Sequence, residues 1–404
     1  MRIRHVLQTV RCLIAAIAAA LACGTVFAAP RQSPPQNVPS EAPPKFQRMD
    51  PTIRPGERVP FPMLTPWVRG TQLKTFEPGK VYVFEVFTTT CSHCEEHFDL
   101  ICELVRAFTP KGVTFISVTN EKAPVVQAWL QKPGKDAAVT WSVACDPGEV
   151  VTARWQNGTF RNFTPRLFVV KDGVLQWIGH PNMSEKPLQQ IVDGTWDVQR
   201  ERDEFTVESL MTRANALIDM VMKRCKQSGD WQPLFDALDD VIEKMPERAG
   251  TLQAQRVMAM IGPADRVDAG YAYGRALLKA YARDARTLRA LARGTLSLSA
   301  VRRRDLDFAL EAAQAADAVD GGTDPKTLDA LAMAHFARGD RDKAIDCMER
   351  ALKLETERKF IKQYQRTLAK YRTDPAVPMP PFNPSAKPVE PAPHAAGEDD
   401  GHGH

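Results

Sequence analysis

The stretch Val81-Tyr-Val-Phe-Glu-Val-Phe-Thr-Thr-Thr-Cys-Ser-His-Cys94 decides the fold of the first half of the chain. Its first seven residues are mostly β-branched or aromatic, which predicts a buried strand over Val81–Phe87. Three threonines then turn the chain, and the next apolar residues recur at helical spacing. Cys91 is therefore expected where a strand meets a helix N-terminus, with Cys94 one turn later. The free N–H groups and dipole of a helix start favour a thiolate at Cys91.

The length of 404 residues indicates two domains plus tails. A net charge of +4 is too small to indicate a nucleic-acid-binding protein. Residues 1–28 combine a basic start, an apolar run and a small-residue cleavage site at Val26-Phe-Ala28, which is typical of a secretory signal peptide. Export, to the periplasm or another extracytoplasmic space, implies an oxidising compartment. Lipidation at Cys23 is the alternative, and it would attach the chain to a membrane.

Residues 29–55 are rich in Pro, Gln and Ser, which predicts a disordered linker. From 56 to 195 strand and helix signals alternate. Strands are expected at 113–118 and 140–144, helices at 123–131, 149–155 and 187–192, and a hairpin at 166–178 around Asp172-Gly173. This order predicts an α/β domain with a mixed central sheet and helices on both faces.

This domain resembles the thioredoxin superfamily, in particular its exported TlpA/ResA-like branch. Three features carry the resemblance: Cys91-Ser-His-Cys94 after an apolar strand, Phe163-Thr-Pro165 before another strand, and the lead-in Gly56–Gly79. The resemblance extends over about a third of the chain. The resemblance implies a thioredoxin-like fold and thiol–disulfide oxidoreductase activity on protein disulfides or dithiols, with a separate redox partner.

The resemblance also implies roles for single residues. Cys91 would be the attacking thiolate and Cys94 the resolving thiol, and together they would form the redox-active disulfide. Thr164 and Pro165 would form the substrate-binding segment, with Pro165 in the cis conformation. Glu85 stands where relatives carry a buried acid, and a carboxyl in an apolar strand has a raised pKa and can accept the proton of Cys94.

Two positions depart from the family pattern. Thr90 replaces the usual Trp before the first cysteine, and His97 replaces an acid after the second. His93 can donate a hydrogen bond to the Cys91 thiolate, and we therefore include it among the catalytic residues. Thiol–disulfide exchange needs no cofactor. A copper site formed by the two histidines with Cys91 and Cys94 remains an alternative.

The other cysteines leave several possibilities open. Cys102 follows on the same helix and is most simply a small buried apolar residue, whereas Cys145 ends a predicted strand. Cys225 and Cys347 lie in the second half of the chain, where an even count of mature cysteines allows them to pair.

From 204 to 372 strand signals vanish, and Ala, Leu, Arg and Asp dominate. Leu331–Leu354 resembles a tetratricopeptide repeat, with Gly339 in the turn between helices and alanines where paired helices approach. Weaker similarity to the same repeat pattern occurs at 305–316 and 267–276. These patterns predict an all-α helical-repeat domain that binds a protein partner, although a generic helical bundle is an alternative.

Residues 373–404 return to Pro, acid and His, which predicts a disordered tail. Three histidines there do not form a defined metal site: His394, His402 and His404. The sequence thus predicts an exported thiol–disulfide oxidoreductase with a repeat domain. A non-catalytic partner-binding scaffold and a copper-handling thioredoxin-fold protein are the alternatives.

Overall fold

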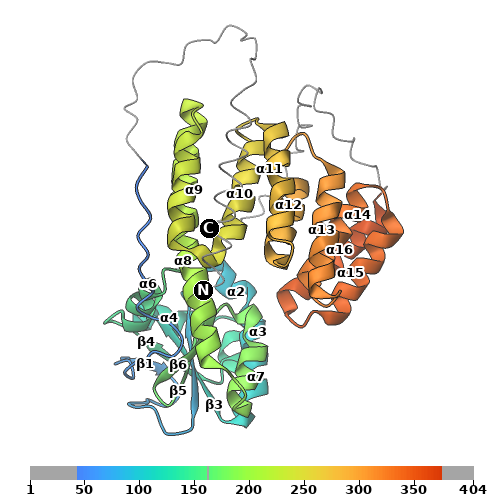
Figure 1. Cartoon of the computed structure of the whole chain (residues 1–404). Helices are drawn as coiled ribbons and strands as arrows, with labels where there is room; N and C mark the ends of the chain where they lie inside the picture. The colour runs from blue at the N-terminus through green and yellow to red at the C-terminus, as the bar shows by residue number, and fades with distance from the viewer. Residues whose placement is uncertain (1–42, 162, 375–404) are drawn as a thin grey trace. The chain divides into compact units, whose positions relative to one another are not determined.

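The computed structural model describes residues 43–161 and 163–374 (Figure 1). The predictions for the signal peptide, Cys23, the first part of the linker and the tail histidines lie outside these residues. The described chain divides into two compact units. One comprises 45–220 with 355–366, and the other comprises 221–354 with the described residues from 367 onward, so the division falls within two helices.

The first unit is built on one six-stranded sheet, with strand order β1-β4-β3-β2-β5-β6. β2 lies between β3, to which it is parallel, and β5, to which it is antiparallel. The strand bounds are Trp67–Arg69 (β1), Val81–Val86 (β2), Val113–Thr119 (β3), Ser142–Cys145 (β4), Arg166–Lys171 (β5) and Val174–Gly179 (β6). The predicted mixed sheet and its hairpin are confirmed, and β1 is an edge strand that the sequence pattern did not indicate.

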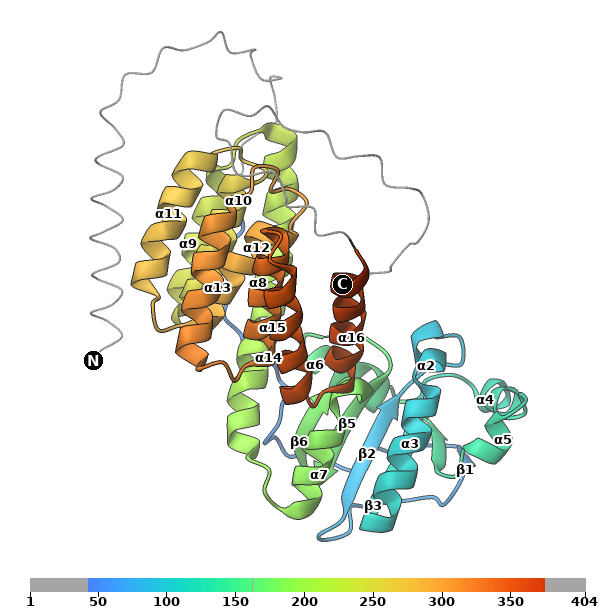
Figure 2. The ribbon, with the colours of Figure 1, turned by 90° about the vertical axis from the view of Figure 1, so that its right-hand side faces the viewer.

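Helices and short helical turns cover both faces of this sheet (Figure 2). Their bounds are Ser92–Glu96 (α2), Phe98–Phe108 (α3), Thr109–Lys111 (η2), Ala123–Leu130 (α4), Lys135–Ala138 (α5), Val150–Trp155 (η3, a π-helix), Gln156–Gly158 (α6), Pro181–Met183 (η4) and Glu185–Asp193 (α7). The helix expected after the cysteines is broken at His97, which separates α2 from α3.

β2 is apolar apart from Glu85, because both of its faces are buried. Val83 and Phe87 pack in the core under α3, α4 and α7, whereas Tyr82 and Phe84 pack in the core that contains Trp155. Side chains alternate between the faces of a strand, so Glu85 points to the same face as Val83 and Phe87. The sheet thus places Glu85 beneath the helix that carries the cysteines.

The end of the proposed linker is ordered rather than disordered. Phe46 is buried, and Ile53 packs against the core around Phe84. The Ile53 N–H donates to the Gly158 carbonyl at 3.1 Å, and the Gly56 N–H donates to the Leu175 carbonyl at 2.7 Å. Composition could not show this, because two apolar side chains and a few backbone bonds are enough to fix an otherwise polar segment.

The second unit is helical throughout. The helices from the end of the first unit onward are Val198–Ser228 (α8), Gln232–Lys244 (α9), Pro246–Arg248 (η5), Ala249–Ile261 (α10), Val267–Ala280 (α11), Ala285–Ser297 (α12), Leu306–Asp320 (α13), Pro325–Ala337 (α14), Arg341–Leu354 (α15) and Arg358–Thr373 (α16). Successive helices pack in pairs, α10 with α11, α12 with α13, and α14 with α15. Ala309 and Ala344 are fully buried between helices, and Gly339 adopts φ +87° in the turn before α15.

Cys225 and Cys347 are buried free thiols, so the pair that the cysteine count allowed is not formed in this structure. No helix in the described part of the chain is long and apolar enough to cross a membrane.

Candidate functional site

Cys91 and Cys94 lie at the start of α2, just after the carboxyl end of β2. Cys91 is the N-cap residue, and its Sγ accepts a hydrogen bond from the Cys94 N–H at 3.1 Å. The Thr164 hydroxyl lies 3.4 Å from the same Sγ, and the Thr164 carbonyl lies 3.9 Å from it. Both cysteines are free, partly buried thiols. The Cys91 sulfur therefore has three hydrogen-bonding groups around it and remains partly open to solvent.

Thr164 precedes Pro165, and the peptide bond between them is cis, as the resemblance implies. These residues lead directly into β5, which pairs with β2. The sheet therefore brings a segment more than 70 residues away in sequence against Cys91, at the position where the resemblance expects a substrate.

The turn that precedes Cys91 is held by Glu121. Its carboxylate accepts a hydrogen bond from the Thr89 N–H and another from the Thr89 hydroxyl, both at 2.7 Å. The Thr119 hydroxyl donates to the same carboxylate at 3.1 Å. The sequence analysis did not identify Glu121. Its position could have indicated it, because Glu121 follows β3 and the carboxyl ends of parallel strands meet at one edge of a sheet.

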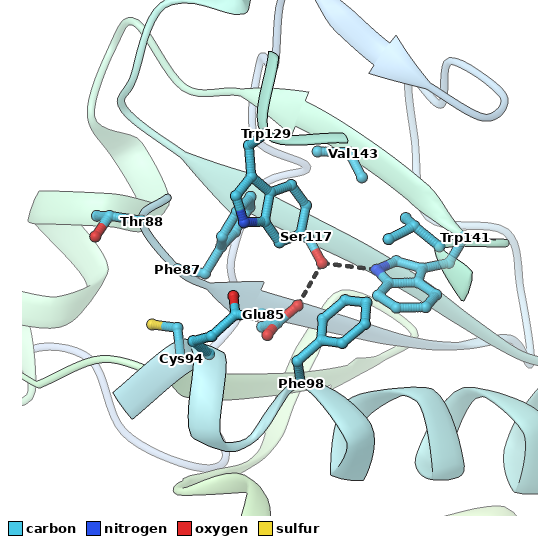
Figure 3. A pocket seen from close by; sticks show the side chains of 11 residues that line it. Glu85, Phe87, Thr88, Cys94, Phe98, Ser117, Trp129, Trp141 and Val143 are labelled. Carbon is cyan, nitrogen blue, oxygen red and sulfur yellow. Dashed lines mark hydrogen bonds between the residues drawn. The ribbon is translucent and has the colours of Figure 1, made fainter. Parts of the chain in front are cut away.

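Glu85 lies on the wall of a small cavity of about 10 Å³ that Cys94 also lines (Figure 3). The carboxyl is 8% exposed. It accepts a short hydrogen bond from the Ser117 hydroxyl, and Ser117 in turn accepts one from the Trp141 indole N–H at 2.7 Å. An indole nitrogen only donates, so the single Ser117 proton must point to Glu85. That carboxyl oxygen is therefore fixed as an acceptor.

Burial sets the acidity of both groups around the cavity. It raises the pKa of Glu85 to about 7, against the opposing effects of the Ser117 hydrogen bond and the charge of Lys135. Burial, and then the hydrogen bond with Cys91, raises the pKa of Cys94 to about 12. The Cys94 thiol therefore keeps its proton at neutral pH, while Glu85, on the same cavity wall, is about half ionised. This is the arrangement that general base catalysis needs.

The two histidines near the cysteines contact other groups. His93 is exposed, and its Nδ1 lies 3.2 Å from the Glu96 carboxylate. His97 Nδ1 donates to the His93 carbonyl at 2.7 Å, so its Nε2 is left to accept from the Asn182 amide at 2.9 Å. The His97 ring also packs edge-on against His180, with centroids 4.6 Å apart. His97 thus joins α2 to the η4 turn.

Cys102 packs against the core beside α3, and Cys145 is buried at the end of β4. Burial raises the pKa of both thiols. Within 43–161 and 163–374 no group of three or more His, Cys, Asp or Glu side chains is placed to hold a metal ion.

Comparison with known proteins gives a match in each half of the chain. Residues 60–178 match the model of the AhpC/TSA family, and residues 325–357 match the tetratricopeptide repeat model. The chain is 29% identical over 140 residues to Protein FixW from Rhizobium leguminosarum, a match that covers 32% of this chain and 62% of FixW. The chain thus spans about three fifths of the length of that relative.

Solved structures similar to the chain include a thiol-disulfide isomerase from Corynebacterium glutamicum, with 15% identity and a TM-score of 0.28 over 35% of this chain and 97% of that one. A putative protein disulfide isomerase from Bacteroides thetaiotaomicron has 17% identity and a TM-score of 0.28 over 39% and 95% of the two chains. Residues 60–178 thus resemble the AhpC/TSA family, and residues 325–357 in the helical unit resemble a tetratricopeptide repeat.

Proposed function

We propose that this chain is an exported thiol–disulfide oxidoreductase that acts on protein substrates, with Cys91 as the nucleophile and Cys94 as the resolving thiol. The observation that carries the proposal is the pairing of a partly open Cys91 thiol with a buried acid, Glu85, on the cavity wall next to Cys94. A merely structural cysteine pair would not need a carboxyl group buried beside it, because burying an acid costs free energy.

The reaction proceeds in two exchanges. In the first, the Cys91 thiolate attacks one sulfur of a substrate disulfide, the substrate S–S bond breaks, and the departing sulfur leaves as a thiolate that takes a proton from water. The donors around Cys91 Sγ, the Cys94 N–H and the Thr164 hydroxyl, hold the attacking sulfur in place. The product is a mixed disulfide between Cys91 and the substrate.

In the second exchange, Cys94 transfers its proton to Glu85 and attacks the Cys91 sulfur. The mixed disulfide breaks, the second substrate thiol is released, and a Cys91–Cys94 disulfide forms. The free carboxyl oxygen of Glu85 receives the proton, since the other oxygen already accepts from Ser117. The same steps in reverse oxidise a substrate dithiol, and a partner thiol or disulfide resets the enzyme.

The remaining parts of the proposal rest on the sequence. The repeat unit would bind a protein partner, because stacked helical repeats present extended surfaces and this unit carries no comparable pair of cysteines among its described residues. Export would depend on the signal peptide, with membrane attachment if Cys23 is lipidated.

The test uses a symmetric nitrothiobenzoate disulfide, which releases one coloured thiol at each exchange. The reduced wild-type chain should release a first equivalent quickly and a second equivalent more slowly. Cys91→Ser should release neither in this way, and Cys94→Ser should release only the first and remain as a mixed disulfide. Cys102→Ser is the matched control and should behave as wild type.

Two results would favour the alternatives. A Cys91→Ser chain that exchanges as fast as wild type, or a wild type that releases nothing, would point to a non-catalytic scaffold. Stoichiometric copper retention that is lost in Cys91→Ser, together with no exchange, would point to copper handling.

A further inference from the structure

A buried lysine lies next to the cavity that Glu85 and Cys94 share. Lys135 is the first residue of α5 and is only 5% exposed, whereas its neighbours Lys132 and Asp136 are exposed. A lysine side chain is almost never buried unless its charge is paired. The position of Lys135 therefore calls for a physical reason.

The contacts of the Lys135 ammonium provide that reason. Nζ lies 2.7 Å from a Glu95 carboxylate oxygen, 3.3 Å from the centre of the Phe98 ring and 5.1 Å from the centre of the Trp129 ring. The faces of aromatic rings attract a cation, and the effect is stronger where water is excluded. Glu95, Phe98 and Trp129 all line the cavity. The ammonium is thus held at the cavity by one carboxylate and two rings.

We propose that Lys135 is a positioning residue for the second exchange, in which its fixed ammonium stabilises the carboxylate form of Glu85 and so keeps this base ready for the Cys94 proton. The inference rests on the proposed function and assigns a residue to its proton-transfer step. Glu85 lines the same cavity as Phe98 and Trp129, the two rings that contact the Lys135 ammonium. This cavity is too small for more than about one water molecule, so solvent screens the two charges weakly.

No other charged group described around this site supplies the positive charge that Lys135 brings near Glu85. Glu95 on α2 is a carboxylate with a 60% exposed side chain, and it holds the lysine through their ion pair. Cys94 keeps its proton, and Cys102 on α3 is a thiol whose pKa burial raises. The guanidinium of Arg69 is paired with Asp136. Among the described neighbours, Lys135 is the cation whose charge lowers the pKa of Glu85.

The experiment measures the second release of coloured thiol as a function of pH, between about pH 5.5 and 9, in the full chain. In wild type this rate should rise with a midpoint near the pKa of Glu85, about 7. Lys135→Met keeps the length and apolar contacts of the side chain but removes its charge, so the midpoint should move up by about one pH unit. The second release should then slow about fivefold at pH 7.

Three further variants make the test specific. Lys135→Arg keeps the charge and should restore a midpoint close to that of wild type. Lys132→Met removes an exposed charge from the same segment and should leave the profile unchanged. Glu95→Gln alters an exposed side chain that tolerates substitution, and it should move the midpoint down, because it removes an anion and leaves the Lys135 charge uncompensated.

The outcomes separate this inference from the proposed function. If Lys135→Met and Glu95→Gln both leave the midpoint of the second release where wild type has it, Lys135 does not act on Glu85 and the inference is wrong, although exchange continues. If wild type shows no second release at all, the proposed function fails first. If Lys135→Met does not fold, the shift in Glu95→Gln decides the question.

Discussion

The burial of Glu85 makes a quantitative prediction about stability. Its pKa is about 7 in the folded chain, against an ordinary value of 4.5. Between these two values the folded chain keeps a proton that the unfolded chain has lost. Stability therefore falls as pH rises through this window, and the loss is complete above about pH 7. A separation of about 2.5 pH units corresponds to about 3 kcal/mol.

Glu85→Gln removes this titration and keeps an oxygen that can accept the Ser117 hydrogen bond. The variant should gain stability relative to wild type as pH rises, by about 2.5 kcal/mol between pH 5 and pH 8. Urea unfolding of the reduced proteins, followed by tryptophan fluorescence, measures this difference. All of the seven tryptophans except Trp231 lie in the first unit, so the signal reports mainly on the unit that contains Glu85.

The control is Glu103→Gln, which neutralises an exposed carboxylate on α3 and should give a difference from wild type that varies little with pH. The reasoning is refuted if the difference in unfolding free energy between Glu85→Gln and wild type is the same at pH 5 and pH 8. That result would mean that Glu85 ionises in the folded chain at its ordinary pKa.

Three further predictions concern the surroundings of the cysteines. Ser117→Ala removes a hydrogen bond that lowers the pKa of Glu85, so the midpoint of the second thiol release should move to higher pH, and an unmoved midpoint would show that this hydroxyl does not tune the acid. Glu121→Ala removes both hydrogen bonds to Thr89, so it should cost about 1–3 kcal/mol in urea unfolding and slow the first release, whereas the exposed neighbour Lys122→Ala should do neither. Because burial raises the pKa of Cys94 to about 12, Cys94 in Cys91→Ser should react with iodoacetamide at pH 8 at least about tenfold more slowly than Cys91 in Cys94→Ser, and equal rates at these two positions in mass spectrometry would contradict the assigned order.

The fold was largely predictable because its signals are local. β2 consists of β-branched and aromatic residues apart from Glu85, and Asp172-Gly173 marks the turn between β5 and β6. β1 was missed because three partly buried residues at the edge of a sheet leave almost no periodic pattern. The break at His97 was missed because apolar spacing continues across it, whereas the Asn182 that contacts the His97 ring belongs to a distant turn.

The placement of Cys91 and Cys94 together at a helix start was predictable, because residue type and spacing carry it. The residues that surround the two cysteines could not be predicted, because their contacts join segments that are far apart in sequence. Lys135 lies in a stretch that looks like an exposed loop, and only packing shows that its charge is buried. His93 shows the opposite case, since the structure pairs its ring with Glu96, and its predicted role toward Cys91 stays a prediction.

The hydrogen-bond chain from Trp141 through Ser117 to Glu85 has a practical consequence. An indole N–H gives a well-separated signal in proton–nitrogen magnetic resonance spectra, and here it lies two hydrogen bonds from an ionisable carboxyl. Loss of the Glu85 proton strengthens the hydrogen bond that the Ser117 hydroxyl donates to Glu85. The polarised Ser117 oxygen then becomes a better acceptor for the Trp141 indole N–H. The Trp141 signal is therefore a built-in reporter, whose frequency should follow the charge of Glu85 during turnover without any added label.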